Sequence, residues 1–245
     1  MKIIMLSAGK GSRLMPLTRN TPKPLLDLNH GKTLLEEQLE SIEKSKVIDE
    51  VVIVVGYLAE QIEAKIKLYI QKGLKITTIY NPFYDISNNL LSLWMAKNHM
   101  DEEFIITNGD NIFKEDVFRD LVQNNSDGIF LTINKKDKYD EDDMKVNLEN
   151  DKLIQVSKTI PLEESNAESV GLVYVSGNRY TNVFRKAMER LVRNFEYRNK
   201  FWLEIFNKLS LNGVNIKTFE IDGETKWKEL DFHPDIENVK KIIGI

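Results

Sequence analysis

The chain of 245 residues contains no cysteine, only three histidines and no excess of positive charge. Without cysteine, disulfide bonds and thiolate metal sites are excluded. His30, His99 and His233 lie too far apart in the sequence to form a local metal-binding motif. The net charge of −4 provides no global field that would recruit nucleic acid or an anionic membrane.

Apolar runs long enough to span a membrane are also absent. The chain begins directly with a predicted strand and shows no signal-peptide pattern. Its length and its 42% apolar content suit one large domain with a sizeable core. We therefore expect a cytoplasmic protein that binds neither nucleic acid nor membranes. The sequence leaves open whether the chain forms a homodimer.

Strands and helices alternate along the first half of the chain. Short apolar runs typical of buried strands lie at 2–7, 50–55, 75–80, 103–107 and 128–133. Helical patterns lie between them, at 34–45, 58–71, 89–98 and 114–124. Such alternation indicates parallel strands with right-handed crossovers. The expected fold is α/β, with a doubly wound, mostly parallel, Rossmann-like sheet.

The pattern changes after about residue 134. Strands are expected at 144–148, 152–157, 170–176, 214–220 and 227–231, and helices at 178–194, 199–211 and 234–242. We interpret the chain as a single domain over residues 1–245, with a core formed by about 1–134. An inserted β-rich and helical lid, over about 135–225, would bind a second substrate, and 226–245 would return to the core.

A glycine-rich loop follows the first predicted strand, and a lysine lies a few residues further on between two prolines. Glycine lets the backbone approach a phosphate closely and direct N–H groups at it. An arginine adds a planar fork of donors and a lysine a compact charge. We therefore predict a triphosphate site at Leu6, Ala8, Gly9, Gly11, Ser12, Arg13 and Lys23.

Other phosphate-binding motifs fit this region poorly. A dinucleotide fingerprint would need a third glycine where the chain has Leu14. A P-loop that ends in Gly31, Lys32 and Thr33 would need a glycine at Leu26. The remaining alternative is a flexible turn with two incidental cations.

Carboxylates lie near the ends of two other predicted strands. Gly109 and Asp110 follow the fourth strand, where ligands of open α/β sheets bind. Glu229 and Asp231 alternate in an extended segment and would face the same side. Asp110, Glu229 and Asp231 are therefore candidate ligands for Mg²⁺, which prefers oxygen. The alternatives are a cap or turn at Asp110 and a solvated strand edge for the other two.

Further polar residues are candidates for substrate recognition. Asn88, Asn89 and Ser92 can donate to and accept from a pyrimidine, although one asparagine is also expected to cap a helix. Lys145 and Lys158 are candidates for an anionic acceptor. Glu168 is a candidate for a cationic head group. For these three charged residues the alternative is a solvated surface.

Several motifs resemble a known family. Residues 8–14 (Ala-Gly-Lys-Gly-Ser-Arg-Leu) and 22–25 (Pro-Lys-Pro-Leu) resemble the signature of the nucleoside-triphosphate transferases. Within that family, residues 81–94, 143–146, 156–158 and 227–231 are similar to the phosphocholine and 2-aminoethylphosphonate cytidylyltransferases. The resemblance covers nearly the whole chain.

The resemblance implies a reaction and a role for several residues. CMP would pass from CTP to a small phosphate or phosphonate acceptor, with Mg²⁺ as cofactor and pyrophosphate as the other product. Asp110 and Asp231, helped by Glu229, would hold Mg²⁺, while Lys23 would contact the α-phosphate and Lys158 the acceptor. The expected catalytic residues are Arg13, Lys23, Asp110 and Asp231. The acceptor oxygen is already ionised near neutral pH, so no strong general base is needed.

Two other functions stay open at this point. A sugar-1-phosphate nucleotidylyltransferase would use the same core. Such enzymes usually have a glycine-rich segment where this chain has 88–91, and Glu-Lys-Pro where it has 157–159. A non-catalytic nucleotide-binding module is the second alternative. The joint presence of Arg13, Lys23, Asp110 and Asp231 argues against it.

Overall fold

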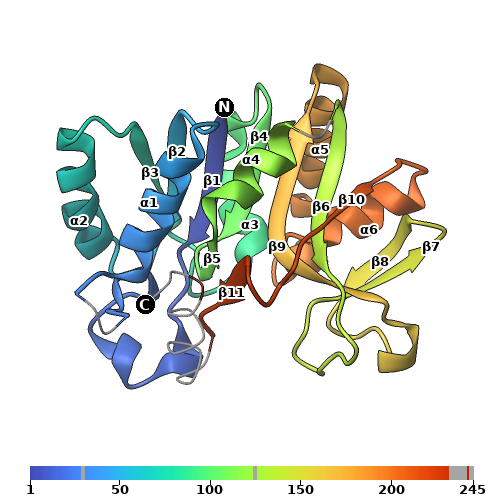
Figure 1. The fold of residues 1–245 in the computed structure, drawn as a ribbon, viewed down its shortest axis with the longest axis horizontal. Coiled ribbons are helices and arrows are strands. Elements are labelled where there is room, and N and C mark those ends of the chain that lie inside the picture. Colours follow the sequence, from blue (N-terminus) through green and yellow to red (C-terminus); the bar gives the residue numbers. More distant parts are fainter. Residues whose placement is uncertain (29–30, 124–125, 232–241, 243–245) are drawn as a thin grey trace.

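The computed structural model describes residues 1–28, 31–123, 126–231 and 242, and it has a central nine-stranded sheet (Figure 1). The strand order is β10 (Lys217–Glu220), β6 (Gly128–Asn134), β9 (Ala167–Ser176), β4 (Phe104–Asn108), β1 (Lys2–Ser7), β2 (Glu50–Val55) and β3 (Ile76–Tyr80). A hairpin of β7 (Lys145–Glu149) and β8 (Lys152–Ser157) continues from β9 to one side. A separate two-stranded sheet pairs β5 (Asn111–Phe113) with β11 (Trp227–Glu229).

Most neighbours in the central sheet are parallel. β4, β1, β2 and β3 run parallel to one another, and so do β10 and β6. β9 is antiparallel to both β4 and β6 and separates them. These findings confirm the predicted α/β class with a mostly parallel sheet.

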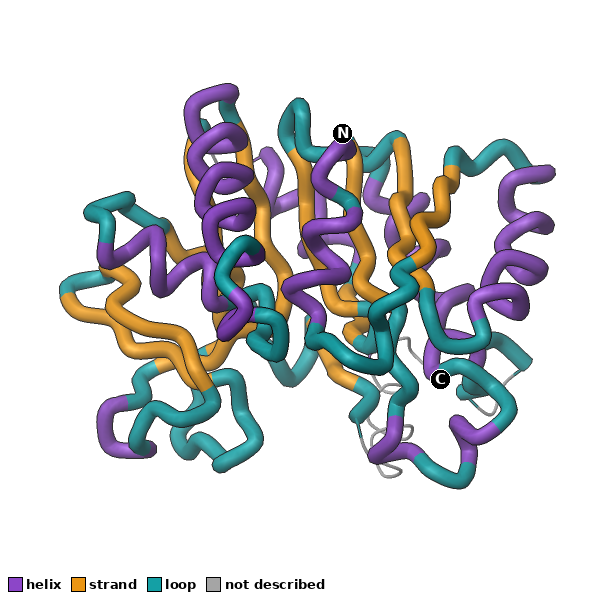
Figure 2. Tube along the Cα trace, turned by 180° about the vertical axis from the view of Figure 1, so that it is seen from behind, coloured by secondary structure: helices purple, strands orange, loops and turns teal. Residues whose placement is uncertain are grey.

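Helices cover both faces of the sheet (Figure 2). One apolar layer joins α1 (Leu34–Ser45), α2 (Ala59–Gln71) and α4 (Glu115–Gln123) to the sheet, and the other joins α3 (Asn89–Met95), α5 (Asn178–Val192) and α6 (Glu204–Leu211). Side chains alternate along β1, so that Ile3 and Met5 enter the first layer and Ile4 and Leu6 the second. Because β1 is buried on both faces, its sequence is a continuous apolar run.

Most predicted elements agree with the structure to within a few residues, but some do not. β5 is only three residues long and was not predicted. α6 begins at Glu204 instead of 199, because a short 3₁₀ helix (Phe195–Tyr197) and a loop precede it. The predicted helix at 234–242 lies outside the described residues, apart from position 242.

The segment predicted as an inserted lid is divided between two locations. Its β7–β8 hairpin packs against α6, where Asn207 exchanges hydrogen bonds with the backbone of Val156 at 2.8 and 3.0 Å. However, β9 and β10 lie within the central sheet. Among the described residues, no helix combines the length and the apolar character needed to cross a membrane.

Candidate active site

A cavity of about 700 Å³ opens at the carboxyl ends of β1 and β4. Its lining includes the glycine-rich loop, the turn after β4, the residues around β11 and part of the loop before β7. Every residue predicted for the site lines this cavity except Lys145. Because β1 and β4 are parallel neighbours, the segments that follow them meet at the same edge of the sheet.

The glycine-rich loop has a left-handed turn at Gly11, where φ is +62°. A Cβ atom there would lie 3.1 Å from the Thr18 side chain and 3.2 Å from Cβ of Lys23. The Thr18 hydroxyl donates to the Gly11 carbonyl at 2.8 Å and fixes the turn. Glycine at this position therefore allows the segment that carries Lys23 to pack directly against the loop.

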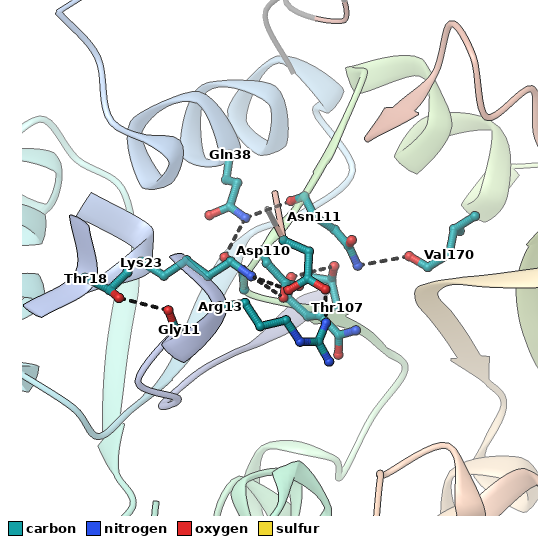
Figure 3. Close-up of polar contacts among 12 residues, drawn as sticks. Gly11, Arg13, Thr18, Lys23, Gln38, Thr107, Asp110, Asn111 and Val170 are labelled. Carbon is teal, nitrogen blue, oxygen red and sulfur yellow. Dashed lines mark hydrogen bonds and ion pairs between the residues drawn. The ribbon is translucent and has the colours of Figure 1, made fainter. Parts of the chain in front are cut away.

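Lys23 is 9% exposed, and its ammonium group lies among carboxylates (Figure 3). Its Nζ atom is 2.9 Å from Asp110 Oδ2 and 3.5 Å from Asp231 Oδ1. Arg13 forms a second ion pair with Asp231. Burial works to lower the pKa of Lys23, but Asp110 and Asp231 outweigh it and raise the pKa above its ordinary value. Lys23 is therefore a fixed positive charge in the site.

The β5–β11 sheet brings the three predicted carboxylates together. Asn111 pairs with Glu229, and the Leu230 N–H donates to the Asp110 carbonyl at 2.9 Å. Burial of the carboxyl group, then the charges of Asp110 and Asp231, raise the pKa of Glu229. Because the Glu229 side chain is exposed to solvent, we attribute less of this rise to burial and more to the two neighbouring carboxylates.

These carboxylates fit a divalent cation. Asp110, Glu229 and Asp231 each offer an oxygen, and the three oxygens lie within 4.8 Å of one another. Asp110 Oδ1 is buried and has no hydrogen-bond partner within the described part of the chain. A buried carboxylate oxygen without a partner is costly unless a ligand satisfies it. Oxygen donors of this kind suit Mg²⁺ or Mn²⁺.

The predicted pyrimidine-reading residues line the cavity and also form hydrogen bonds within the protein. Asn88 caps α3 by accepting from the Asn89 N–H at 2.7 Å, as one alternative anticipated. Asn89 Oδ1 accepts from the Trp202 backbone N–H at 2.9 Å. The Ser92 hydroxyl accepts from Asn81 Nδ2 at 3.0 Å. These bonds fix the orientation of this part of the cavity wall.

Lys158 and Glu168 also line the cavity. Lys158 lies 3.4 Å from Asp142. Glu168 is 4% exposed and forms an ion pair of 2.9 Å with Lys136. Burial raises the pKa of Glu168, in opposition to its hydrogen bonds with Asn134 and Lys136.

Lys145 was predicted to bind an anionic acceptor, but its side chain does not reach the cavity. It is 2% exposed, and Nζ donates to the carbonyl oxygens of Asp140 at 3.4 Å and Glu141 at 2.9 Å. The loop before β7 folds over this ammonium group. Asp140, Asp142 and Asp143 of this loop line the cavity instead.

Two buried amides near Asp110 were not predicted from the sequence. Gln38 of α1 donates to the carbonyls of Gly109 and Asn111, and Asn111 donates to Val170 (Figure 3). The polar run Asn-Gly-Asp-Asn at 108–111 could have drawn attention to Asn111. No local pattern marks Gln38, because its partner is 71 residues away.

The fold and the residues that line the cavity are typical of nucleotide-transferring enzymes, and comparison with known proteins agrees. A family model described as nucleotidyl transferase matches residues 2–143. The chain belongs to this family.

The relatives include several cytidylyltransferases. The CTP:phosphoglutamine cytidylyltransferase of Campylobacter jejuni is 28% identical over 97% of this chain and 98% of its own length. The choline-phosphate cytidylyltransferase of Streptococcus pneumoniae is 37% identical, but the match covers 50% of this chain and only 51% of that relative. The bifunctional protein GlmU of Methanococcus aeolicus is 28% identical over 98% of this chain and 56% of its own length.

Solved structures show the same fold. The CTP:phosphocholine cytidylyltransferase of Streptococcus pneumoniae has a TM-score of 0.78 and 23% identity, covering 99% of this chain and 98% of its own. The inositol-1-phosphate CTP transferase of T. maritima also has a TM-score of 0.78, with 20% identity over 99% of this chain and 96% of its own.

Proposed function

We propose that this nucleotidyltransferase is a Mg²⁺-dependent cytidylyltransferase. It transfers CMP from CTP to a small phosphate or phosphonate acceptor of the phosphocholine or 2-aminoethylphosphonate type, and releases pyrophosphate. The observation that carries the proposal is the position of Lys23. A buried ammonium group lies between two carboxylates and against a glycine-rich loop, at the edge where nucleotides bind to α/β sheets.

The residues divide the reaction between donor and acceptor. Backbone N–H groups of the loop around Gly11, together with Arg13, bind the β- and γ-phosphates, and Lys23 contacts the α-phosphate. Asn88, Asn89 and Ser92 face the cytosine. Lys158 holds the anionic group of the acceptor, and Lys145 acts only through the loop that it supports.

The chemistry requires positioning and charge stabilisation. An oxygen of the acceptor forms a bond to the α-phosphorus, and the bond from that phosphorus to the bridging oxygen of pyrophosphate breaks. Lys23 and Arg13 neutralise charge that develops on the α-phosphate and the leaving group. Mg²⁺, when held by Asp110 and Asp231 with Glu229 nearby, would supply further charge neutralisation at the phosphates. The acceptor oxygen is already ionised, so no residue needs to remove a proton.

The cytidylyltransferase relatives support CTP as the donor, and one of them matches over almost its full length. The acidic residues around Lys158 support an acceptor that also carries a positive group. Asp140, Asp142, Asp143 and Glu168 outnumber Lys136, Lys145 and Lys158 in this cluster.

Two substitutions test the assignment of the site. Asp110→Ala is expected to abolish transfer while circular dichroism shows an intact fold. Full Mg²⁺-dependent turnover by this variant would overturn the metal assignment. Lys158→Met is expected to raise KM for the acceptor at least tenfold while KM for CTP stays unchanged, since one charge-assisted contact is worth about 1.5–3 kcal/mol. Lys152→Met is the matched control, because Lys152 is exposed at the start of β8, the strand that Lys158 follows, and does not line the cavity.

A sugar-1-phosphate nucleotidylyltransferase is the second candidate function. The full-chain match to GlmU favours it. Turnover of a sugar 1-phosphate, with the acceptor KM insensitive to Lys158→Met, would replace the first proposal by this one.

A further inference from the structure

The two-stranded β5–β11 sheet carries the candidate metal ligands. Asp110 directly precedes β5, Glu229 ends β11, and Asp231 lies two residues further on. Within the described residues, the two strands pair with each other and not with the central sheet. The contacts that attach this small sheet to the rest of the protein therefore decide where the carboxylates lie.

Asn111 is the first such contact and is 3% exposed. Its Nδ2 donates to the Val170 carbonyl of β9 at 2.9 Å, and its Oδ1 accepts from Trp227 Nε1 of β11 at 3.1 Å. One side-chain amide thus joins β5, β11 and the central sheet. The two bonds require a donor and an acceptor on the same side chain, which an amide provides.

Gln38 of α1 is the second contact and is 4% exposed. Its Nε2 donates to the carbonyls of Gly109 at 3.1 Å and Asn111 at 2.7 Å, which are the residues on either side of Asp110 (Figure 3). Gln38 Oε1 is buried without a partner in the described part of the chain. Since both partners are acceptors, the two N–H donors are what this position supplies.

We propose that Gln38 and Asn111 are positioning residues that hold the Asp110 and Asp231 carboxylates together for the divalent cation. This inference rests on the metal site of the proposed function. Gln38 acts through the backbone on both sides of Asp110, and Asn111 acts through Trp227 on the strand that leads to Asp231. Partners that orient metal ligands change metal affinity by about 10–100-fold when they are removed.

The test compares two substitutions on the same helix. Gln38→Met keeps the length of the side chain and removes both donors. Ser41→Ala is the matched control, because the Ser41 hydroxyl donates to the Phe113 carbonyl at 2.5 Å, at the other end of β5. The readout is Mn²⁺ binding by calorimetry to the intact protein without nucleotide, together with the melting temperature.

Gln38→Met is expected to weaken Mn²⁺ binding about tenfold. Ser41→Ala is expected to lower the melting temperature and leave Mn²⁺ binding unchanged. Gln38→Asn keeps the amide one methylene shorter, and it is expected to weaken binding by an intermediate amount. This milder variant decides the question if Gln38→Met fails to fold.

Wild-type affinity in Gln38→Met or Gln38→Asn would overturn the inference, as would an equal loss of affinity in Ser41→Ala. If wild type and Asp110→Ala bind Mn²⁺ equally, the metal site itself is wrong and the inference falls with it. If no acceptor is cytidylylated but the Gln38 variants still weaken Mn²⁺ binding, the proposed function fails and the positioning role stands.

Discussion

Replacing Lys23 with methionine is expected to destabilise the protein and to make its stability more dependent on divalent cations. Methionine keeps the length of the side chain against the Gly11 loop but removes the charge. Asp110, Glu229 and Asp231 then repel one another without the ammonium group that lies 2.9 Å from Asp110 and 3.5 Å from Asp231.

The size of the effect follows from the burial of the ion pair. The Lys23 side chain is 11% exposed, whereas Asp110 and Asp231 are 24% and 21% exposed. Breaking a buried pair costs about 3–5 kcal/mol, and the partial exposure of both aspartates places this case near the lower end, at about 3 kcal/mol. For a chain of this length that corresponds to a fall in Tm of roughly 6–12 °C.

Thermal unfolding in EDTA and then in increasing Mg²⁺ measures both effects. Mg²⁺ is expected to raise Tm further in Lys23→Met than in wild type, because the cation replaces a missing positive charge. Lys2→Met is the matched control, since Lys2 pairs with the exposed Asp101 at 3.1 Å and should lose less than about 1 kcal/mol. Wild-type melting of Lys23→Met in EDTA would refute this role of Lys23, as would equal stabilisation of Lys23→Met and wild type by Mg²⁺.

Two further predictions concern stability. Burial alone would raise the pKa of Glu36, but its ion pair with Lys65 and its hydrogen bonds lower the pKa to about 2. Because the pKa is depressed, ionised Glu36 stabilises the fold at pH values above the ordinary pKa of 4.5. This contribution is lost as the pH falls toward 2. Glu36→Gln should therefore cost about 2 kcal/mol at pH 7 and almost nothing near pH 2, measured by urea unfolding; a pH-independent difference contradicts this. Gly109→Ala would place Cβ 2.1 Å from the Ser7 hydroxyl, so it should cost about 2–3 kcal/mol, whereas Gly9→Ala, with nothing within 4 Å, should be neutral. Equal melting temperatures for the two alanine variants would contradict the steric explanation.

The parts of the fold that could be predicted are those with a local signal. Residues 2–7 and 50–55 are buried on both faces, and their continuous apolar runs predict β1 and β2 correctly. β5 could not be predicted, because three residues show no periodicity and its pairing with Glu229 depends on a strand more than 110 residues later. β9 was predicted as a strand, but its antiparallel place between β4 and β6 is set by tertiary packing.

The same distinction holds for the candidate site. Gly11 lies in the loop that follows β1, Lys23 lies further along the same connection, and Asp110 follows β4, so their meeting at one edge of the sheet could be predicted. The acidic residues at 140–143 could not, since charged loops usually face solvent. Lys136 and the buried Lys145 hold this loop against the cavity through contacts that only the folded chain makes.

The activity that we propose for this protein is transfer of CMP from CTP to a small acceptor. The test is to measure pyrophosphate release in the presence of Mg²⁺. Each of CTP, UTP, dTTP and GTP is combined with a panel of acceptors that contains small phosphates, phosphonates and sugar 1-phosphates. We predict that pyrophosphate is released only when CTP is combined with a small amino-alcohol phosphate or phosphonate. Release with a sugar 1-phosphate instead, or no release with any pair, would contradict the claim.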